Sequence, residues 1–445
     1  MEKLLVAVLV TAICLTGCSA ATEDLTAKQI FSASDALYMQ EAVAFSGSEQ
    51  EDRVSTTQSG GDAAGEETGF LGEDTNPASD DVPQLSKAST VQSPLVCTYF
   101  SMTDEEQNAE DGISVFISHC SNVFFSTENA ETNAWLRSEM DRINNETELY
   151  CQEIYERSLE DYAMFCSSAE EMDIQFYTHS YYHDAATTRQ DSGIISLLLI
   201  DSSYCGGAHP NYTQIAYNFD LNRQRVLSLA DVLYPDTCDE LLERLLQKLE
   251  DRFASLEGYG LFPEYQETVK ALFADSGLTP CWYFTDDSLV IYFNCYDIAP
   301  YAAGIVKIAF PYSELEGILL AEFFPEDLGE EDGNLEILEN AEDRTVLTLL
   351  PDSQSGNPIY LGTNGTIYNV KVCNLSSWID EQTPIVGQML FSANRLSSQD
   401  ALVLCELSAR NASDYLVNYQ SVDGTYYSFA VTLDGLKAVS LPLKG

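Results

Sequence analysis

Two adjacent glycines, Gly206 and Gly207, lie between strand-like runs at 193–201 and 212–221 and constrain this chain more than any other stretch. Glycine adopts backbone angles that other residues avoid, so the pair allows a tight turn. The proline after His209 fixes the exit from the turn and pushes His209 toward an extended conformation. We therefore predict a strand, a glycine corner that carries His209, and a returning strand.

Helical and strand-like patterns around this corner predict an α+β fold. Apolar residues recur at helical spacing over 129–162 and 237–258, and strand-like runs lie before and after each stretch. We expect an antiparallel sheet backed by these two long helices over residues 95–325. The acidic, glycine-containing segment at 325–333 is typical of a linker, and at least seven short strands separated by turn residues follow it. They predict a small all-β sandwich or barrel as a second domain over 335–445.

The N-terminus has the pattern of a lipoprotein export signal. Lys3 precedes an apolar run that is shorter than the roughly 20 residues needed to span a bilayer. Two small residues, Thr16 and Gly17, then precede Cys18. We expect residues 1–17 to be removed and Cys18 to carry lipid, which anchors the protein to the outer face of the bacterial cytoplasmic membrane. An ordinary secretory signal with an incidental cysteine is the alternative.

Residues 18–94 are predicted to form a disordered acidic tether. They are rich in Ser, Thr, Gly, Asp and Glu, and they contain too little apolar surface to offset the entropy of ordering. The acidity is not confined to this tether, because the whole chain has 71 acidic and 21 basic residues and a net charge of −50. Nucleic acid and anionic wall polymers would be repelled, whereas a cationic partner would be attracted. Acidity that serves solubility alone is the alternative.

The 12 cysteines favour disulfides, since a processed lipoprotein would keep ten of them in an oxidising environment. Cys373 and Cys405 are the only pair in the predicted second domain, so we expect a bridge between them first. The connectivity of the other cysteines stays open. Because no CxxC pair occurs, we expect neither a thiol-redox centre nor a cysteine zinc site.

Two aromatic-rich runs supply the candidate binding residues, which are Tyr204, Gly206, Gly207, His209, Asn218, Asp220, Tyr296 and Tyr301. The first run is the glycine corner with the strand that leaves it, and the second is a bend over 296–304. The alternative for both is structural, with hydrogen bonds inside the loop and packing of the rings.

No metal site, cofactor or catalytic residue is predicted. His179 and His183 have a spacing that suits zinc on a helix, but the surrounding sequence is strand-like. Two side chains four residues apart on a strand lie about 13 Å from each other, too far for one ion. No serine occupies a G-x-S-x-G nucleophile turn.

Three stretches together resemble a known family. They are the corner at 206–209 with the strand at 218–221, the run at 227–231, and the bend at 296–304 followed by Pro311 and Tyr312. They are similar to the extracytoplasmic domain shared by the anti-sigma factor RsiV and the N-terminal part of the peptidoglycan deacetylase PdaC, over about residues 110–320. The resemblance implies an α+β domain outside the membrane, which in the anti-sigma factor is a receptor for lysozyme. Neither a sigma-binding segment nor a deacetylase domain is recognised here, so we expect the sensing module alone on a lipid anchor.

These observations predict a non-enzymatic, cell-surface lipoprotein whose first domain binds a cationic protein such as lysozyme or a cell-wall component. One alternative is an envelope enzyme that acts on glycan, with His209 and Asp220 in acid–base roles. The other is a structural lipoprotein that holds envelope proteins through its second domain.

Overall fold

The computed structural model describes residues 93–168, 176–254, 260–274, 280–329, 331–348, 358–378, 384–404, 415–432 and 435–439. The predicted signal sequence and all but the last two residues of the predicted tether, with Cys18, lie outside these residues, as does Cys405. Within them, no helix combines the length and apolarity needed to cross a bilayer.

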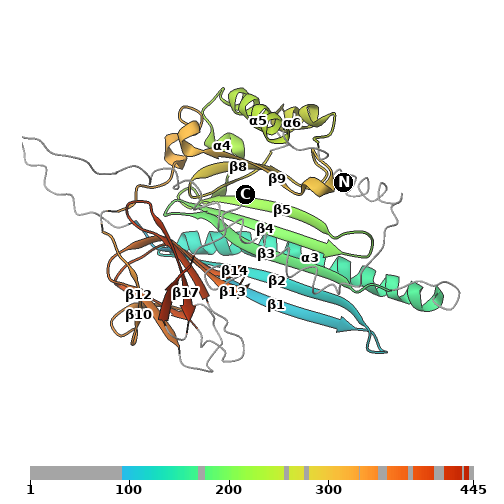
Figure 1. Ribbon diagram of the computed structural model, residues 1–445, viewed down its shortest axis with the longest axis horizontal. Helices are drawn as coiled ribbons and strands as arrows, with labels where there is room; N and C mark the ends of the chain where they lie inside the picture. The colour runs from blue at the N-terminus through green and yellow to red at the C-terminus, as the bar shows by residue number, and fades with distance from the viewer. Residues whose placement is uncertain are drawn as a thin grey trace, which may run out of the picture. The chain divides into compact units, whose positions relative to one another are not determined.

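Most of the described strands form one sheet of eleven strands in the order β18-β17-β16-β13-β14-β1-β2-β3-β4-β5-β6 (Figure 1). All of its pairings are antiparallel except the one between β2 and β3, which are joined by a long helix. A parallel pair needs such a crossover. The strands are β1 (Val96–Asn108), β2 (Ser114–Thr127), β3 (His179–Gln190), β4 (Ile194–Tyr204), β5 (Asn211–Asp220), β6 (Arg225–Val226), β13 (Ile367–Trp378), β14 (Pro384–Leu396), β16 (Tyr415–Gln420), β17 (Tyr426–Thr432) and β18 (Gly435–Ala438).

The crossover helix is α3 (Ala130–Ser168), and its start is set by Asn129. The Asn129 side-chain oxygen accepts hydrogen bonds from the backbone N–H groups of residues 131 and 132, which satisfies two donors of the first turn. Leu136, Met140 and Ile143 recur on one face and are buried in the core beneath the large sheet. This helix was predicted, although it extends six residues beyond the predicted end.

The second predicted helix covers a different sheet. It is α5 (Cys238–Phe253), which buries Leu241, Leu245 and Leu249 together with apolar residues of a three-stranded sheet. That sheet consists of β7 (Cys281–Phe284), β8 (Ser288–Phe293) and β9 (Val306–Pro311), and the short helices α4 (Leu229–Val232) and α6 (Tyr265–Ala274) belong to the same region. The fold is thus broadly α+β and mostly sheet, but two long helices against one sheet are not confirmed.

The C-terminal strands are not confined to a sheet of their own. Cys97 of β1 pairs with Ala393 of β14, so these strands continue the large sheet. A four-stranded sheet packs on them through a shared apolar core that includes Leu361, Leu402 and Phe391. Its strands are β10 (Leu335–Leu338), β12 (Ile359–Thr363), β15 (Asp400–Leu404) and β11 (Thr345–Thr348). Among the described residues these are two facing sheets, so the barrel alternative was wrong.

Candidate binding surface

The glycine corner connects β4 to β5 as the sequence predicts. Gly206 and Gly207 have φ angles of +84° and +105°, and a Cβ on either would meet nothing within 4 Å. Glycine is therefore required here by backbone conformation and not by lack of space. The Tyr204 hydroxyl donates a hydrogen bond of 3.1 Å to the Gly207 carbonyl, which closes the corner from the β4 side.

A second bend follows β8 and is fixed to β5. The Asn294 side chain accepts a hydrogen bond from the backbone N–H of Gln214 (2.7 Å) and donates one to its carbonyl (3.2 Å). Tyr296 then takes a positive φ of +71°, which is uncommon for a residue with a large side chain. A turn of 3₁₀ helix over Tyr301–Ala303 ends at Gly304, whose φ is +66°. The bend thus holds two tyrosines beside the start of β5.

The two bends bring four rings together in what we call the aromatic surface: His209, Tyr212, Tyr296 and Tyr301. The His209 ring stacks on Tyr301 with centroids 3.7 Å apart and planes inclined by 18°. The centroids of Tyr296 and Tyr212 lie 5.9 and 6.5 Å from that of Tyr301. Tyr296 is 53% exposed and the other three rings are half-buried. Two segments separated by more than 80 residues therefore build one ring cluster at the protein surface.

Hydrogen bonds fix the orientation of the His209 ring. Its Nδ1 lies 3.0 Å from the Pro210 carbonyl, which can only accept, so Nδ1 carries the proton. The Nε2 atom is then left to accept a hydrogen bond from the Tyr296 hydroxyl at 3.3 Å. His209 thus makes the hydrogen bond within its own loop that the structural alternative predicted, and it also joins the two bends.

The other two candidate binding residues, Asn218 and Asp220, lie at the far end of β5 and are buried. The Asn218 side chain accepts a hydrogen bond from Ser196 (2.5 Å) and donates one to the Trp282 carbonyl (3.1 Å). The Asp220 carboxylate accepts from the backbone N–H groups of residues 222 and 223 and pairs with Arg223 at 2.9 Å. Both side chains therefore hold the fold together and do not reach the aromatic surface.

An acid–base pair of His209 and Asp220 is excluded by this placement. The strand between them spans about 30 Å at roughly 3.3 Å per residue. A general acid and a general base must both reach the reacting groups within hydrogen-bond distance. The alternative of an envelope enzyme that acts on glycan thus loses the acid–base pair that was assigned to it.

Tyr212 is the one member of the aromatic surface that sequence reasoning missed. It is the second residue of β5 and follows Pro210 by two positions. No motif marks Tyr212 in the sequence. Its position directly after the glycine corner is the signal that could have identified it.

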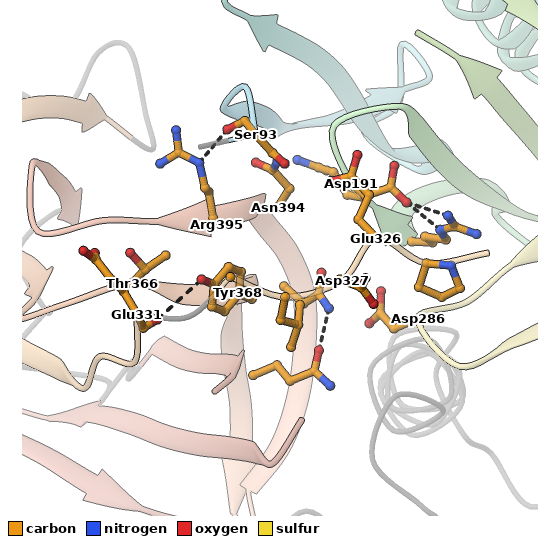
Figure 2. Close-up of a pocket in the computed structure, with 17 residues that line it drawn as sticks. Ser93, Asp191, Asp286, Glu326, Asp327, Glu331, Thr366, Tyr368, Asn394 and Arg395 are labelled. Atoms are coloured by element: carbon orange, nitrogen blue, oxygen red, sulfur yellow. Dashed lines mark hydrogen bonds and ion pairs between the residues drawn. The ribbon is translucent and has the colours of Figure 1, made fainter. Parts of the chain in front are cut away.

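The predicted acidic linker lies against the fold and forms one wall of a pocket of about 710 Å³ (Figure 2). Glu326 contacts the Ser192 hydroxyl, and the backbone carbonyl of Glu331 accepts a hydrogen bond from Tyr368. The inner carboxylates of this pocket are neutralised by cations. Asp191 pairs with Arg189 at 2.6 Å, and Asp286 pairs with Lys371 at 2.6 Å. We therefore regard this pocket as a structural junction between the two halves of the chain.

The histidines on β3 have separate partners. His179 contacts Asp161 at 2.9 Å, and His183 contacts Asp201 at 2.6 Å. In the part of the chain that the structure describes, no group of three or more His, Cys, Asp or Glu residues is arranged to hold a metal ion.

The nine cysteines among the described residues carry free thiols in this structure, Cys373 included. Because Cys405 lies outside the described residues, the Cys373–Cys405 bridge stays a prediction. Burial raises the pKa of the Cys373 thiol to about 12.

Comparisons with known proteins relate part of this structure to one family. Residues 231–313 match the family described as "Protein of unknown function (DUF3298)". The match begins at the end of α4 and spans α5, α6 and the three-stranded sheet, and it includes Tyr296 and Tyr301 but not His209. No curated protein matches the chain.

Two crystal structures of members of this family are similar to the chain. One, from Bacteroides fragilis, is 19% identical with a TM-score of 0.39, and the similarity covers 50% of this chain and 94% of that protein. The other, from Pseudomonas aeruginosa, is 21% identical with a TM-score of 0.33, covering 52% of this chain and 96% of that protein. The family match itself is confined to residues 231–313, the segment that supplies Tyr296 and Tyr301 of the aromatic surface.

Proposed function

We propose that this protein is a non-enzymatic binding protein that docks a cationic protein on its aromatic surface. The observation that carries the proposal is the gathering of His209, Tyr212, Tyr296 and Tyr301 from two distant segments, with Tyr296 more than half exposed at a positive φ. Backbone strain of this kind persists only where the surroundings impose it, and it is found most often at functional sites.

The chemistry of the surface suits lysine and arginine side chains. A cation over a tyrosine face gains about 0.5–1 kcal/mol when exposed and about 2 kcal/mol when desolvated. The exposed Asp297 adjoins Tyr296 and adds a negative charge at the same bend. The net charge of −50 would speed the encounter with a cationic protein by electrostatic steering. Tyrosine is also among the residues that dominate binding energy in protein interfaces.

Lysozyme is the partner that we propose to test first, because the sequence resembles the RsiV/PdaC-like domains and lysozyme is strongly basic. Titration of the purified full chain with lysozyme should give saturable binding that weakens as salt rises. A basic protein of another fold at the same concentration is the control for charge alone, and muropeptides test the cell-wall alternative. Absence of lysozyme binding, or equal binding of the control, would contradict the proposal; binding of muropeptides alone would favour the wall-fragment alternative.

We further propose that lipid on Cys18 holds the binding domain at the outer face of the cytoplasmic membrane. The small residues before Cys18 support this. Replacing Cys18 with alanine should move the protein from the membrane fraction to the soluble fraction and remove the acyl mass from the N-terminal peptide. A variant that stays in the membrane fraction would refute lipid anchoring at this cysteine.

A further inference from the structure

Helix α3 buries side chains in its two halves and none between them. Its N-terminal half buries Leu136, Met140 and Ile143, and its C-terminal half buries Ile154 and Ser158. None of the side chains at 144–153 is buried. Burial of apolar side chains supplies most of the free energy that holds a helix on a sheet. The middle of α3 therefore gains little stabilisation from packing.

A cavity of about 380 Å³ lies under this stretch, between α3 and the β1–β2 pair. The helix contributes Thr147 and Cys151 to its wall, and β2 contributes Ser118 and Cys120. Polar and apolar atoms share the walls almost equally, so the cavity gives the helix little hydrophobic packing against the sheet.

Two thiols face each other across this cavity. Cys120 and Cys151 are both half-buried, and both side chains line this cavity close enough to interact electrostatically. Both also pack against the small core cluster that contains Phe116 and Tyr181. The two free thiols therefore belong to one small region between α3 and β2, and a bond between them would bring the sulfur atoms to about 2.05 Å.

We propose that Cys120 and Cys151 form a disulfide that fastens the middle of α3 to β2 in the oxidised protein. The proximity of the two thiols and the absence of buried side chains at 144–153 of α3 carry this inference. It is independent of the ligand that the aromatic surface binds.

The bond forms by two thiol–disulfide exchanges. The interaction with Cys120 lowers the pKa of the Cys151 thiol, so Cys151 is the attacking group. Its thiolate attacks the disulfide of an oxidant, such as a thiol oxidoreductase or oxidised glutathione, and one thiolate leaves. Cys120, after losing its proton, then attacks Cys151 and releases the second thiolate. Two thiols are thus oxidised, and one disulfide of the oxidant is reduced to two thiols.

Peptide mapping without reductant tests the pairing. The full chain is refolded in a glutathione redox buffer, alkylated after unfolding and digested. We expect one cross-linked product that contains Cys120 and Cys151 and disappears on reduction. Alkylation of both thiols, or a bond from either to another cysteine such as the neighbouring Cys205, would overturn the proposal.

Thermal unfolding tests what the bond does. Closing a loop of about 30 residues stabilises a protein enough to raise Tm by roughly 6–12 °C. Cys120→Ser and Cys151→Ser should therefore each lower the Tm of the oxidised protein by this amount, and the double variant should lower it no further. Cys166→Ser, at an exposed position of the same helix, is the matched control and should leave Tm unchanged. Additive losses in the double variant would show that the cysteines act separately.

Discussion

Replacing Lys371 with methionine is expected to lower the free energy of unfolding by about 3–5 kcal/mol at neutral pH. Lys371 on β13 and Asp286 in the turn between β7 and β8 form an ion pair of 2.6 Å, and their side chains are only 4% and 3% exposed. Methionine fills a similar volume but leaves the Asp286 carboxylate without its cation in a buried site. Unfolding by urea measures the loss, and Lys270→Met on the exposed face of α6 is the control.

The loss should depend on pH in a defined direction. Burial already raises the pKa of Asp286, while Lys371 lowers it, so removing Lys371 raises it further. A carboxyl group whose folded pKa lies above its unfolded value of 3.8 favours folding when it is protonated. The deficit of Lys371→Met should thus be largest at neutral pH and decrease as the pH falls through the raised pKa.

Asp286→Asn in the Lys371→Met background should restore part of the stability, because it removes the buried charge. An equal deficit at neutral and mildly acidic pH, or no restoration by Asp286→Asn, would contradict this account of the pair.

Replacing Arg189 with methionine should cost a similar amount, about 3–5 kcal/mol. The buried Arg189 guanidinium donates to the Tyr312 hydroxyl (3.0 Å) and to the carbonyls of Phe323 (2.6 Å) and Phe324 (3.1 Å). It also pairs with Asp191 and lies over the Phe284 ring. Methionine leaves two carbonyls and one carboxylate without this donor.

Arg189 holds the segment after Tyr312 against the end of β3. Its loss should therefore increase local opening of that segment before the whole protein unfolds. Hydrogen exchange at 323–329 should become faster in Arg189→Met even under conditions where the protein stays folded. Arg137→Met, at an exposed position of α3, is the control for loss of an arginine. Stability and exchange equal to those of the control would show that Arg189 does not hold this segment.

Local sequence patterns predicted the elements of this fold but not their pairing. The recurrence of Leu241, Leu245 and Leu249 predicted α5 because helical periodicity is a property of a short window. The pairing of Cys97 with Ala393 joins strands almost 300 residues apart, and nothing in either strand specifies its partner. For the same reason the sequence did not predict the Lys371–Asp286 pair, or the packing of the acidic linker on the fold.

Only part of the candidate site was predicted, because local patterns show where the chain turns but not which distant side chains meet. Glycine and proline showed where the chain turns, and the turns carry His209, Tyr296 and Tyr301. Asn218 and Asp220 were predicted because they lie in the strand that leaves the glycine corner, in a stretch that resembles the family. Their partners, such as Ser196 and Arg223, come from positions that the pattern does not connect with them.

Titration of lysozyme into the full chain carrying Tyr301→Ala tests the central claim most directly. The Tyr301 ring contacts both His209 and Tyr296, so its removal should weaken binding at least tenfold, about 1.4 kcal/mol or more, with Tm within a few degrees of the wild type. Tyr234→Ala, at a tyrosine that is 40% exposed after α4, is the matched control and should bind as the wild type does. Unchanged lysozyme binding by the folded Tyr301→Ala protein, or an equal loss in Tyr234→Ala, would contradict docking on the aromatic surface.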